Sequence, residues 1–127
     1  MTMYRTIDCI IVISAFALSV TATARAASYT VTDLGTLGGT ESFGSGLNVS
    51  GQAAGASYTI GDAAYHAYLW KPTTPNGASG AKTDLGTLGG AYSGATGINN
   101  AGQVVGQADT AGSERHAFLY SGGVMTD

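Results

Sequence analysis

Short apolar runs alternate with polar residues and glycine-rich turns along most of this chain. RHAFLY at 115–120 alternates in this way, and it follows QVVGQAD at 103–109 and SGATGIN at 93–99. Alternation with a period of two is typical of a half-buried β-strand. We therefore predict three strands at these positions, joined by polar turns at 100–102 and 110–114.

A fourth strand is predicted next. SGG at 121–123 is a tight hairpin signal, and VMTD at 124–127 begins the strand after it. Counterparts of this fourth strand lie at 82–88 and 28–37. No segment after the N-terminal region combines helical periodicity with freedom from Gly and Pro, so the sequence predicts an all-β antiparallel meander.

The chain repeats itself at a spacing of 51 residues. DLGTLGG occurs at 33–39 and again, unchanged, at 84–90. Further matches pair GQAAG at 51–55 with GQVVG at 102–106, and HAYLW at 66–70 with HAFLY at 116–120. Self-similarity of this kind indicates tandem structural units.

The two copies differ by one inserted stretch. KPTTPNGASGAK at 71–82 is rich in Pro, Gly and Ser and has no counterpart in the second copy, so we predict an inserted loop. Without it the unit is about 43 residues long, which suits a four-stranded propeller blade. We expect a first repeat at 27–83 and a second at 84–127, the latter ending at the start of a third.

The repeated phrase has a structural interpretation. We expect TDLGTL to end one strand, and the glycines that follow to permit a positive-φ corner into the next unit. These glycines are Gly38, Gly39, Gly89 and Gly90.

The N-terminus has the pattern of a secretory signal peptide. Arg5 precedes an eleven-residue apolar run at 10–20, and Ala-Arg-Ala at 24–26 fits a signal-peptidase site. The run is too short for a membrane-spanning helix. Cys9 lies upstream of it, which does not fit a lipoprotein signal. We predict a signal peptide at 1–26 and an extracellular or periplasmic product with no membrane span after cleavage, the alternative being an uncleaved anchor.

Charge and cysteine content narrow the function classes. After residue 26 the chain has no cysteine, so no disulfide is expected there. Only Lys71, Lys82 and Arg115 stand against seven acids in that region. A nucleic-acid partner is excluded because it requires a cationic face.

These motifs together resemble the HAF-repeat family of extracellular bacterial proteins. The resemblance rests on DLGTLGG, on GINNAGQVVGQA at 97–108 and on His116-Ala117-Phe118, and it covers nearly all of 29–127. Tyr68 replaces the family's phenylalanine in the first copy. The resemblance implies secretion, tandem repeats and propeller-like packing, and it implies no established activity. Members of the family are expected to carry more repeats.

Two repeats would leave two open faces and unpaired edge strands. About three repeats are usually needed for stability, and closed propellers have more. The sequence therefore allows a fragment of a longer array, a remnant, or several chains that complete a ring by self-association through open repeat faces.

Histidine and aspartate recur at equivalent positions. His66 and His116 are too few for a metal site, which needs three or four convergent ligands, so we expect each to hydrogen-bond within its own repeat. Asp33, Asp84 and Asp127 have no calcium-loop pattern around them. We expect each Asp to accept N–H groups of the corner that follows, and a His–Asp bond within each repeat is a further hypothesis.

Four aromatic residues are candidates for ligand contact: Tyr58, Tyr65, Trp70 and Tyr92. They could stack on sugar rings, but ordinary packing between repeats is the alternative, and Trp70 is expected in the core together with its counterpart Tyr120.

The sequence has no G-x-S-x-G, P-loop or G-x-G-x-x-G motif, and no cofactor is implied. We therefore expect a non-enzymatic extracellular binding or surface-interaction module, with glycan or protein as ligand. The alternatives are a truncated remnant without independent function and, less favoured, a propeller-type hydrolase.

Overall fold

The computed structural model describes residues 28–127, so the predicted signal peptide at 1–26 lies outside the described part. Val31–Asp127 form one compact unit, and the three described residues of the unit before it form no strand. The bounds of the strands are β1 Gly38–Leu47, β2 Ala53–Thr59, β3 Tyr65–Pro72, β4 Gly80–Asp84, β5 Gly89–Ile98, β6 Val104–Thr110, β7 Arg115–Ser121 and β8 Val124–Thr126. A single 3₁₀ turn, η1 Ile60–Asp62, is the only helical element among the described residues, and the predicted all-β class is confirmed.

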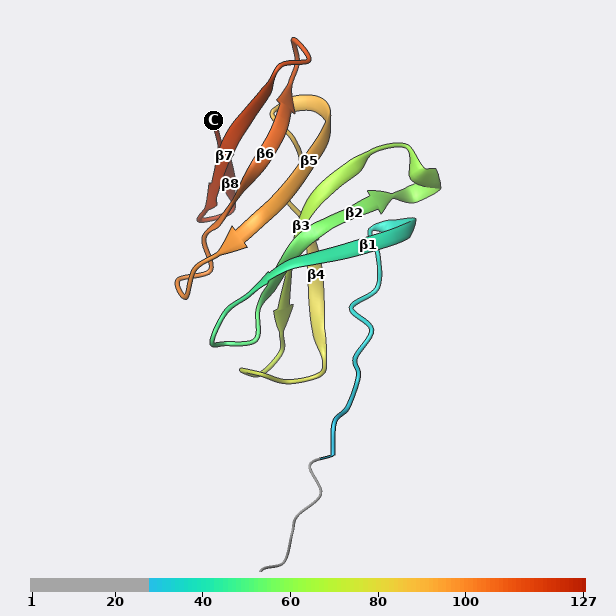
Figure 1. The fold of residues 1–127 in the computed structure, drawn as a ribbon, viewed down its shortest axis with the longest axis vertical. Helices are drawn as coiled ribbons and strands as arrows, with labels where there is room; N and C mark the ends of the chain where they lie inside the picture. The colour runs from blue at the N-terminus through green and yellow to red at the C-terminus, as the bar shows by residue number, and fades with distance from the viewer. Residues whose placement is uncertain (1–27) are drawn as a thin grey trace, which may run out of the picture. The chain divides into compact units, whose positions relative to one another are not determined.

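The eight strands form one open sheet. Its order is β1-β2-β3-β5-β6-β7-β8, with β4 also paired to β3 (Figure 1). Within it, β1–β4 make a first antiparallel meander and β5–β8 a second. The two meanders are joined in the ladder by one parallel pair, Tyr65 with Tyr92.

The two meanders have the same register. Gly46 pairs with Ala54 in the first, and Gly97 pairs with Val105 in the second, 51 residues further on. Each ladder has an irregularity just before this pair. At the corresponding site of β2, a Cβ on Gly55 would collide with the carbonyl oxygen of Phe43, so the close approach of the strands requires glycine there.

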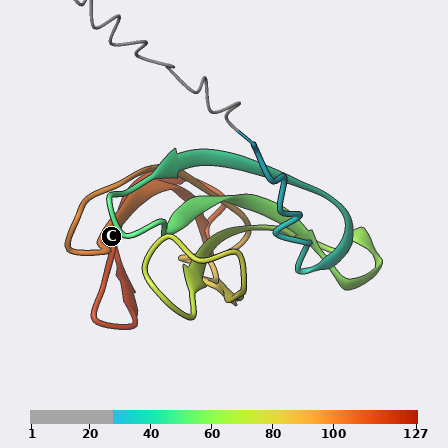
Figure 2. The same ribbon diagram turned by 90° about the horizontal axis from the view of Figure 1, so that it is seen from below.

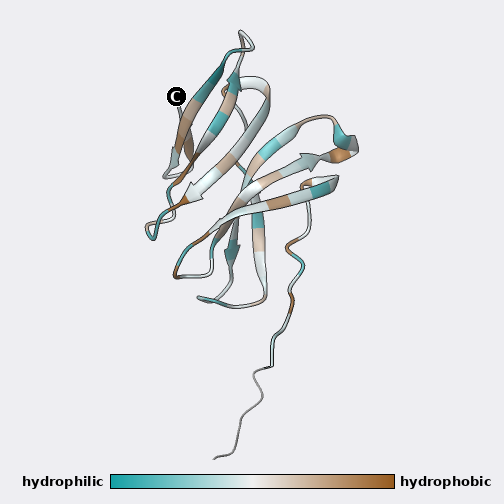
Figure 3. Ribbon diagram, viewed as in Figure 1, coloured by the Kyte–Doolittle hydropathy of each residue, from teal (hydrophilic) through white to brown (hydrophobic). Residues whose placement is uncertain are grey.

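One face of the first meander packs on the second. Teal and brown bands follow one another along β6 (Figure 3), and Val104, Gly106 and Ala108 are its buried positions, as expected when alternate residues face a core. The core between the meanders consists of Ala54, Ala67, Leu69, Leu85, Ala95, Val104, Ala108 and Phe118. β5 is the strand that approaches β1, β2 and β3 across this core, and Figure 2 shows the ribbons of the first meander side by side.

The other face of the first meander is covered by the segment before β1. Tyr68 and Trp70 are buried there, and Leu34 and Leu37 pack against them. In the second meander, the equivalent leucines Leu85 and Leu88 belong to the cluster that contains Phe118. The repeated phrase therefore supplies two leucines that cover the aromatic face of the meander that follows it.

One strand prediction is wrong at its end and another is wrong throughout. The strand predicted at 82–88 stops at Asp84, and 28–37 contains no strand apart from a bridge at Leu37. The reason is that Gly35 and Gly86 adopt φ of 70° and 73°, which turns the chain two residues after the aspartate. The DLGTL segments are therefore corners rather than strand ends.

The predicted loop at 71–82 is also too long. β3 continues to Pro72 and β4 starts at Gly80, because Lys71 pairs with Ala81 and extends the ladder. Only residues 73–79 form the loop. The hairpin predicted at 121–123 is present, with φ of 62° at Gly122 and 92° at Gly123.

Among the described residues, none belongs to a helix with the length and apolar character needed to cross a bilayer.

Candidate functional site

The recurring histidines each bond to an aspartate. His66 Nδ1 lies 2.9 Å from Asp84 Oδ2, and His116 Nδ1 lies 2.7 Å from Asp127 Oδ2. Each meander thus contains one His–Asp bond, as hypothesised, although the predicted boundary between 83 and 84 had assigned Asp84 to the second repeat. No group of three or more potential metal-binding side chains occurs in the described part of the chain. These pairs tie β3 and β7 to the end of the strand beside them.

The aspartates of the repeated phrase also cap the corner, as expected. Asp33 Oδ1 accepts the N–H of Gly35 over 2.8 Å, and Asp84 Oδ1 accepts that of Gly86 over 2.8 Å. A carboxylate oxygen that accepts the N–H two residues on is an Asx turn, which fixes a tight bend.

The glycine pairs start β1 and β5. Gly38 and Gly89 have φ of 99° and 108°, so the positive-φ corner exists at the first glycine of each pair. Gly39 and Gly90 are not at positive φ. A Cβ at Gly39 would crowd Tyr58 and the Asp62 carboxylate, so glycine is needed there for space rather than for φ.

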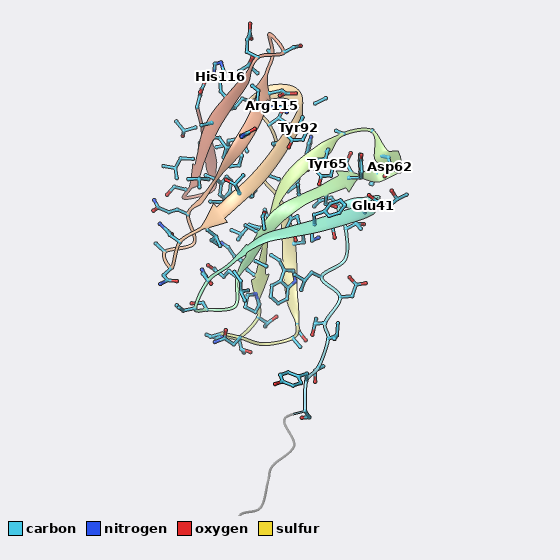
Figure 4. All side chains as sticks on the ribbon, in the orientation of Figure 1. Glu41, Asp62, Tyr65, Tyr92, Arg115 and His116 are labelled. Atoms are coloured by element: carbon cyan, nitrogen blue, oxygen red, sulfur yellow. The ribbon has the colours of Figure 1, made fainter. Side chains whose placement is uncertain are left out.

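Three of the four candidate aromatics gather where the two meanders join. Tyr58 meets Tyr65 edge to face with ring centroids 4.8 Å apart, and Tyr65 stacks on Tyr92 at 5.7 Å. Arg115 lies over the Tyr92 ring at 4.1 Å. Figure 4 shows Tyr65, Tyr92 and Arg115 at this joint, with His116 on the second meander. Trp70 is 7% exposed and belongs to the core, so it is not a surface residue.

Burial and neighbouring charges shift the pKa of two side chains in this cluster, Tyr65 and Arg115. Burial raises the pKa of the Tyr65 phenol, and Tyr92, Tyr58 and Glu41 raise it further. The hydrogen bond from Arg115 Nε to Asp109, 2.8 Å long, raises the pKa of the guanidinium. Both shifts favour a neutral Tyr65 phenol beside a charged Arg115 guanidinium.

Beside this stack lies a pocket of about 260 Å³, which we call the tyrosine pocket. It opens between β1 and β5, and Phe43, Tyr65, Tyr92, Thr96 and Gln107 are among its lining residues. Phe43 is 56% exposed. Tyr65 and Arg115 both lie against the Tyr92 ring, whereas more than half of Phe43 is exposed, so the Phe43 ring offers an apolar surface to a ligand.

Comparison with known proteins gave no match. No protein-family model, curated protein or solved structure is similar to this chain. The resemblance to HAF repeats thus stays a prediction from the sequence motifs.

Sequence reasoning found the three tyrosines but not their partners. Phe43 lies in the strand TESFGSG and gives no signal in a single copy, because its counterpart in the second repeat is Gly94. The sequence gives no signal for Gln107 and Arg115, because the pairing of β6 with β7 brings them to the site. An apolar ring, a neutral amide and phenol edges can hold a neutral polar ligand.

Proposed function

We propose that this chain is a non-enzymatic extracellular binding module of tandem HAF-type repeats, and that it holds a saccharide chain in the tyrosine pocket. The motifs of the sequence and the predicted signal peptide support the family and the location. A common register and a His–Asp pair in each meander support tandem units packed like propeller blades.

The observation that carries the ligand class is the exposed ring of Phe43 beside the side chains of Thr96 and Gln107. A sugar ring has an apolar C–H face and a rim of hydroxyl groups. The face would lie on the phenylalanine, and the hydroxyls would bond to the Gln107 amide, which makes no hydrogen bond to another side chain in the described part of the chain. Pockets of this kind use apolar contact for affinity and a few polar groups for orientation.

A chemical-shift titration tests this proposal. Neutral soluble oligosaccharides of several linkage types are added to the ¹⁵N-labelled chain, and the expected result is a saturable shift of Gly94, Ala95 and Thr96 amides. The variant Phe43→Ala should raise the dissociation constant for the oligosaccharide at least tenfold, which corresponds to about 1.4 kcal/mol of binding free energy. Ile60→Ala is the matched control, because Ile60 is an exposed apolar residue, 79% accessible, outside the pocket.

If no oligosaccharide shifts the pocket amides, the saccharide class is wrong. If the chain does not unfold cooperatively in urea, the interpretation as a truncated remnant without independent function replaces the binding module.

A further inference from the structure

The second meander exposes the face that the first meander buries. Ala54 and Leu69 of the first meander are 0% and 1% exposed, because they pack on the second. The same positions in the second meander are Val105 and Leu119, which pair with each other as Ala54 and Leu69 do. They are 48% and 43% exposed.

A hollow lies on this open face. It measures about 410 Å³ and is lined by Gly97, Ile98, Asn99, Gln103, Val105 and Leu119. The equivalent face of the first meander is buried against the second meander. That internal contact therefore shows what kind of surface would cover the open face.

The complement is exposed on the first meander. In the internal contact, Ile98 of the second meander packs beside Gly46 of the first. The counterpart of Ile98 is Leu47, which is 72% exposed. The counterpart of Gly46 is Gly97, which lines the hollow on the open face.

Hydrogen bonds between the two meanders also have counterpart groups on the open faces. The Ala67 N–H donates to Ser93 Oγ over 2.8 Å, and Ser93 Oγ donates in turn to the Gly86 carbonyl. The counterpart hydroxyl, Ser42, donates to the Gly35 carbonyl over 2.7 Å in the same way. Among the described residues no group donates a hydrogen bond to Ser42 Oγ, so it can accept one from the counterpart donor, the Ala117 N–H.

Asn48 and Asn99 show the same relation, with a bond between the meanders on one side and, within the described part of the chain, a free donor on the other. Asn48 Nδ2 donates to Gln52 Oε1 and also to the Asn99 carbonyl, over 2.6 Å and 3.1 Å. Asn99 Nδ2 donates to Gln103 Oε1 over 2.7 Å and has no second acceptor among the described residues.

We propose that the chain binds a second copy of itself head to tail, with the open face of the second meander on the first meander of the next copy. Leu47 of the next copy fills the hollow beside Gly97, the Ala117 N–H donates to Ser42 Oγ, and Asn99 Nδ2 donates to the Asn48 carbonyl. The contact is heterologous, so each copy keeps one free face of each kind until a ring closes.

The internal contact and the proposed contact between copies differ in one charged side chain. Lys82 stands on the first meander where the second has Met125, which packs against the core. The Lys82 ammonium lies 3.7 Å from the centroid of the Tyr68 ring and donates to the Gly35 carbonyl. Its charge is therefore already held within its own chain, and its methylene stem remains for the contact.

Sedimentation equilibrium on the full chain tests the proposal. The expected result is a concentration-dependent mass of two or more copies. Leu119→Asp and Leu47→Asp should each reduce the association constant at least tenfold, whereas Ile60→Asp, an exposed apolar position outside both surfaces, should leave it unchanged.

Mixing the two variants distinguishes the geometry. Leu119→Asp keeps an intact Leu47 surface, and Leu47→Asp keeps an intact open face, so an equimolar mixture should form a heterodimer although neither variant associates alone. A face-to-face contact between two open faces predicts instead that Leu47→Asp alone still dimerises, which would overturn the head-to-tail arrangement. A monomeric wild-type chain at all soluble concentrations would overturn self-association itself, and circular dichroism of each variant shows that it is folded.

Discussion

The side-chain amide of Asn48 donates a hydrogen bond to the carbonyl oxygen of Asn99, its own counterpart in the second meander, over 3.1 Å. Both asparagines organise the same turn, because Oδ1 of each accepts the N–H two and four residues on. Asn48 is 7% exposed, and Asn99 is exposed. The same residue in the same kind of turn is therefore buried in the first meander and exposed in the second.

Replacing these two asparagines one at a time separates the stability contribution of the turn from that of the bond between the meanders. Asn99→Ala removes the turn bonds alone and is expected to lower the free energy of unfolding by about 1 kcal/mol, whereas Asn48→Ala also loses the bond between the meanders and is expected to cost about 2–3 kcal/mol. Urea unfolding followed by the fluorescence of Trp70, the single tryptophan, measures both. Equal losses would mean that the bond between the meanders contributes nothing.

The leucine pair tests the core in the same manner. Leu69→Ala opens a cavity between the meanders and is expected to cost about 2–5 kcal/mol. Its counterpart Leu119 is 43% exposed, so Leu119→Ala at low protein concentration should cost under about 1 kcal/mol. Thermal unfolding at matched concentrations checks the difference, and a costly Leu119→Ala in the dilute monomer would contradict the assignment of an open face.

A glycine substitution tests the close approach of β1 and β2. Gly55→Ala would place a methyl group against the Phe43 carbonyl, so the strands must separate and the loss is expected to be about 1–3 kcal/mol or more. At Gly44, on the partner strand, a Cβ would meet only the Tyr68 hydroxyl at ordinary contact distance. Gly44→Ala should therefore be nearly neutral, and a similar loss for both variants would attribute the effect to strand propensity instead.

The His–Asp pair can be isolated with the two corner aspartates. Asp33 bonds the N–H of Gly35, while Asp84 bonds both the N–H of Gly86 and His66. Asp84→Ala should lower Tm by a few degrees more than Asp33→Ala, because it removes one additional charge-assisted bond. If the two variants melt together, the bond to His66 contributes nothing measurable to stability.

Alkaline pH should weaken the fold through Tyr68. Burial raises the pKa of its phenol above 10.0 in the folded state, so its stabilising contribution is complete below pH 10.0 and is lost as pH rises through the folded pKa. Lys82 acts in the opposite direction, since burial lowers its pKa below 10.5, although the charge of Asp33 partly restores it. Tyr68→Phe should therefore flatten the alkaline loss of unfolding free energy and Lys82→Met should steepen it, as measured by urea titrations across this range.

The strands and the repeat could be predicted from the sequence because both depend on local pattern. RHAFLY alternates, and SGG closes a hairpin, so β7 and its turn follow directly from the residues. The ends of the corner strands could not be predicted in this way. Gly35 and Gly86 stand in the middle of an apolar phrase, and only the φ angle shows that the chain turns there.

The pocket depends on pairings that no local pattern contains. Phe43 reaches it from β1, Tyr92 from β5 and Gln107 from β6, and the ladders of β1 and β5 are irregular between Gly38 and Ser42 and between Gly89 and Ser93, before these residues or around them. The tyrosines were found because aromatic residues near strand ends are conspicuous in a sequence. The sequence marks Arg115 only as one of three bases, because its contact with the Tyr92 ring depends on the pairing of strands.

The single backbone pair between β3 and β5 also bears on how the chain acquires its fold. Every other paired strand follows its partner directly along the sequence, so each meander can form from successive hairpins with short loops to close. Closure of such loops is fast, and contacts between segments distant in sequence come later. We therefore expect docking at Tyr65 and Tyr92 to be the late event, with Leu69 of the first meander exposed to solvent until the second meander has formed.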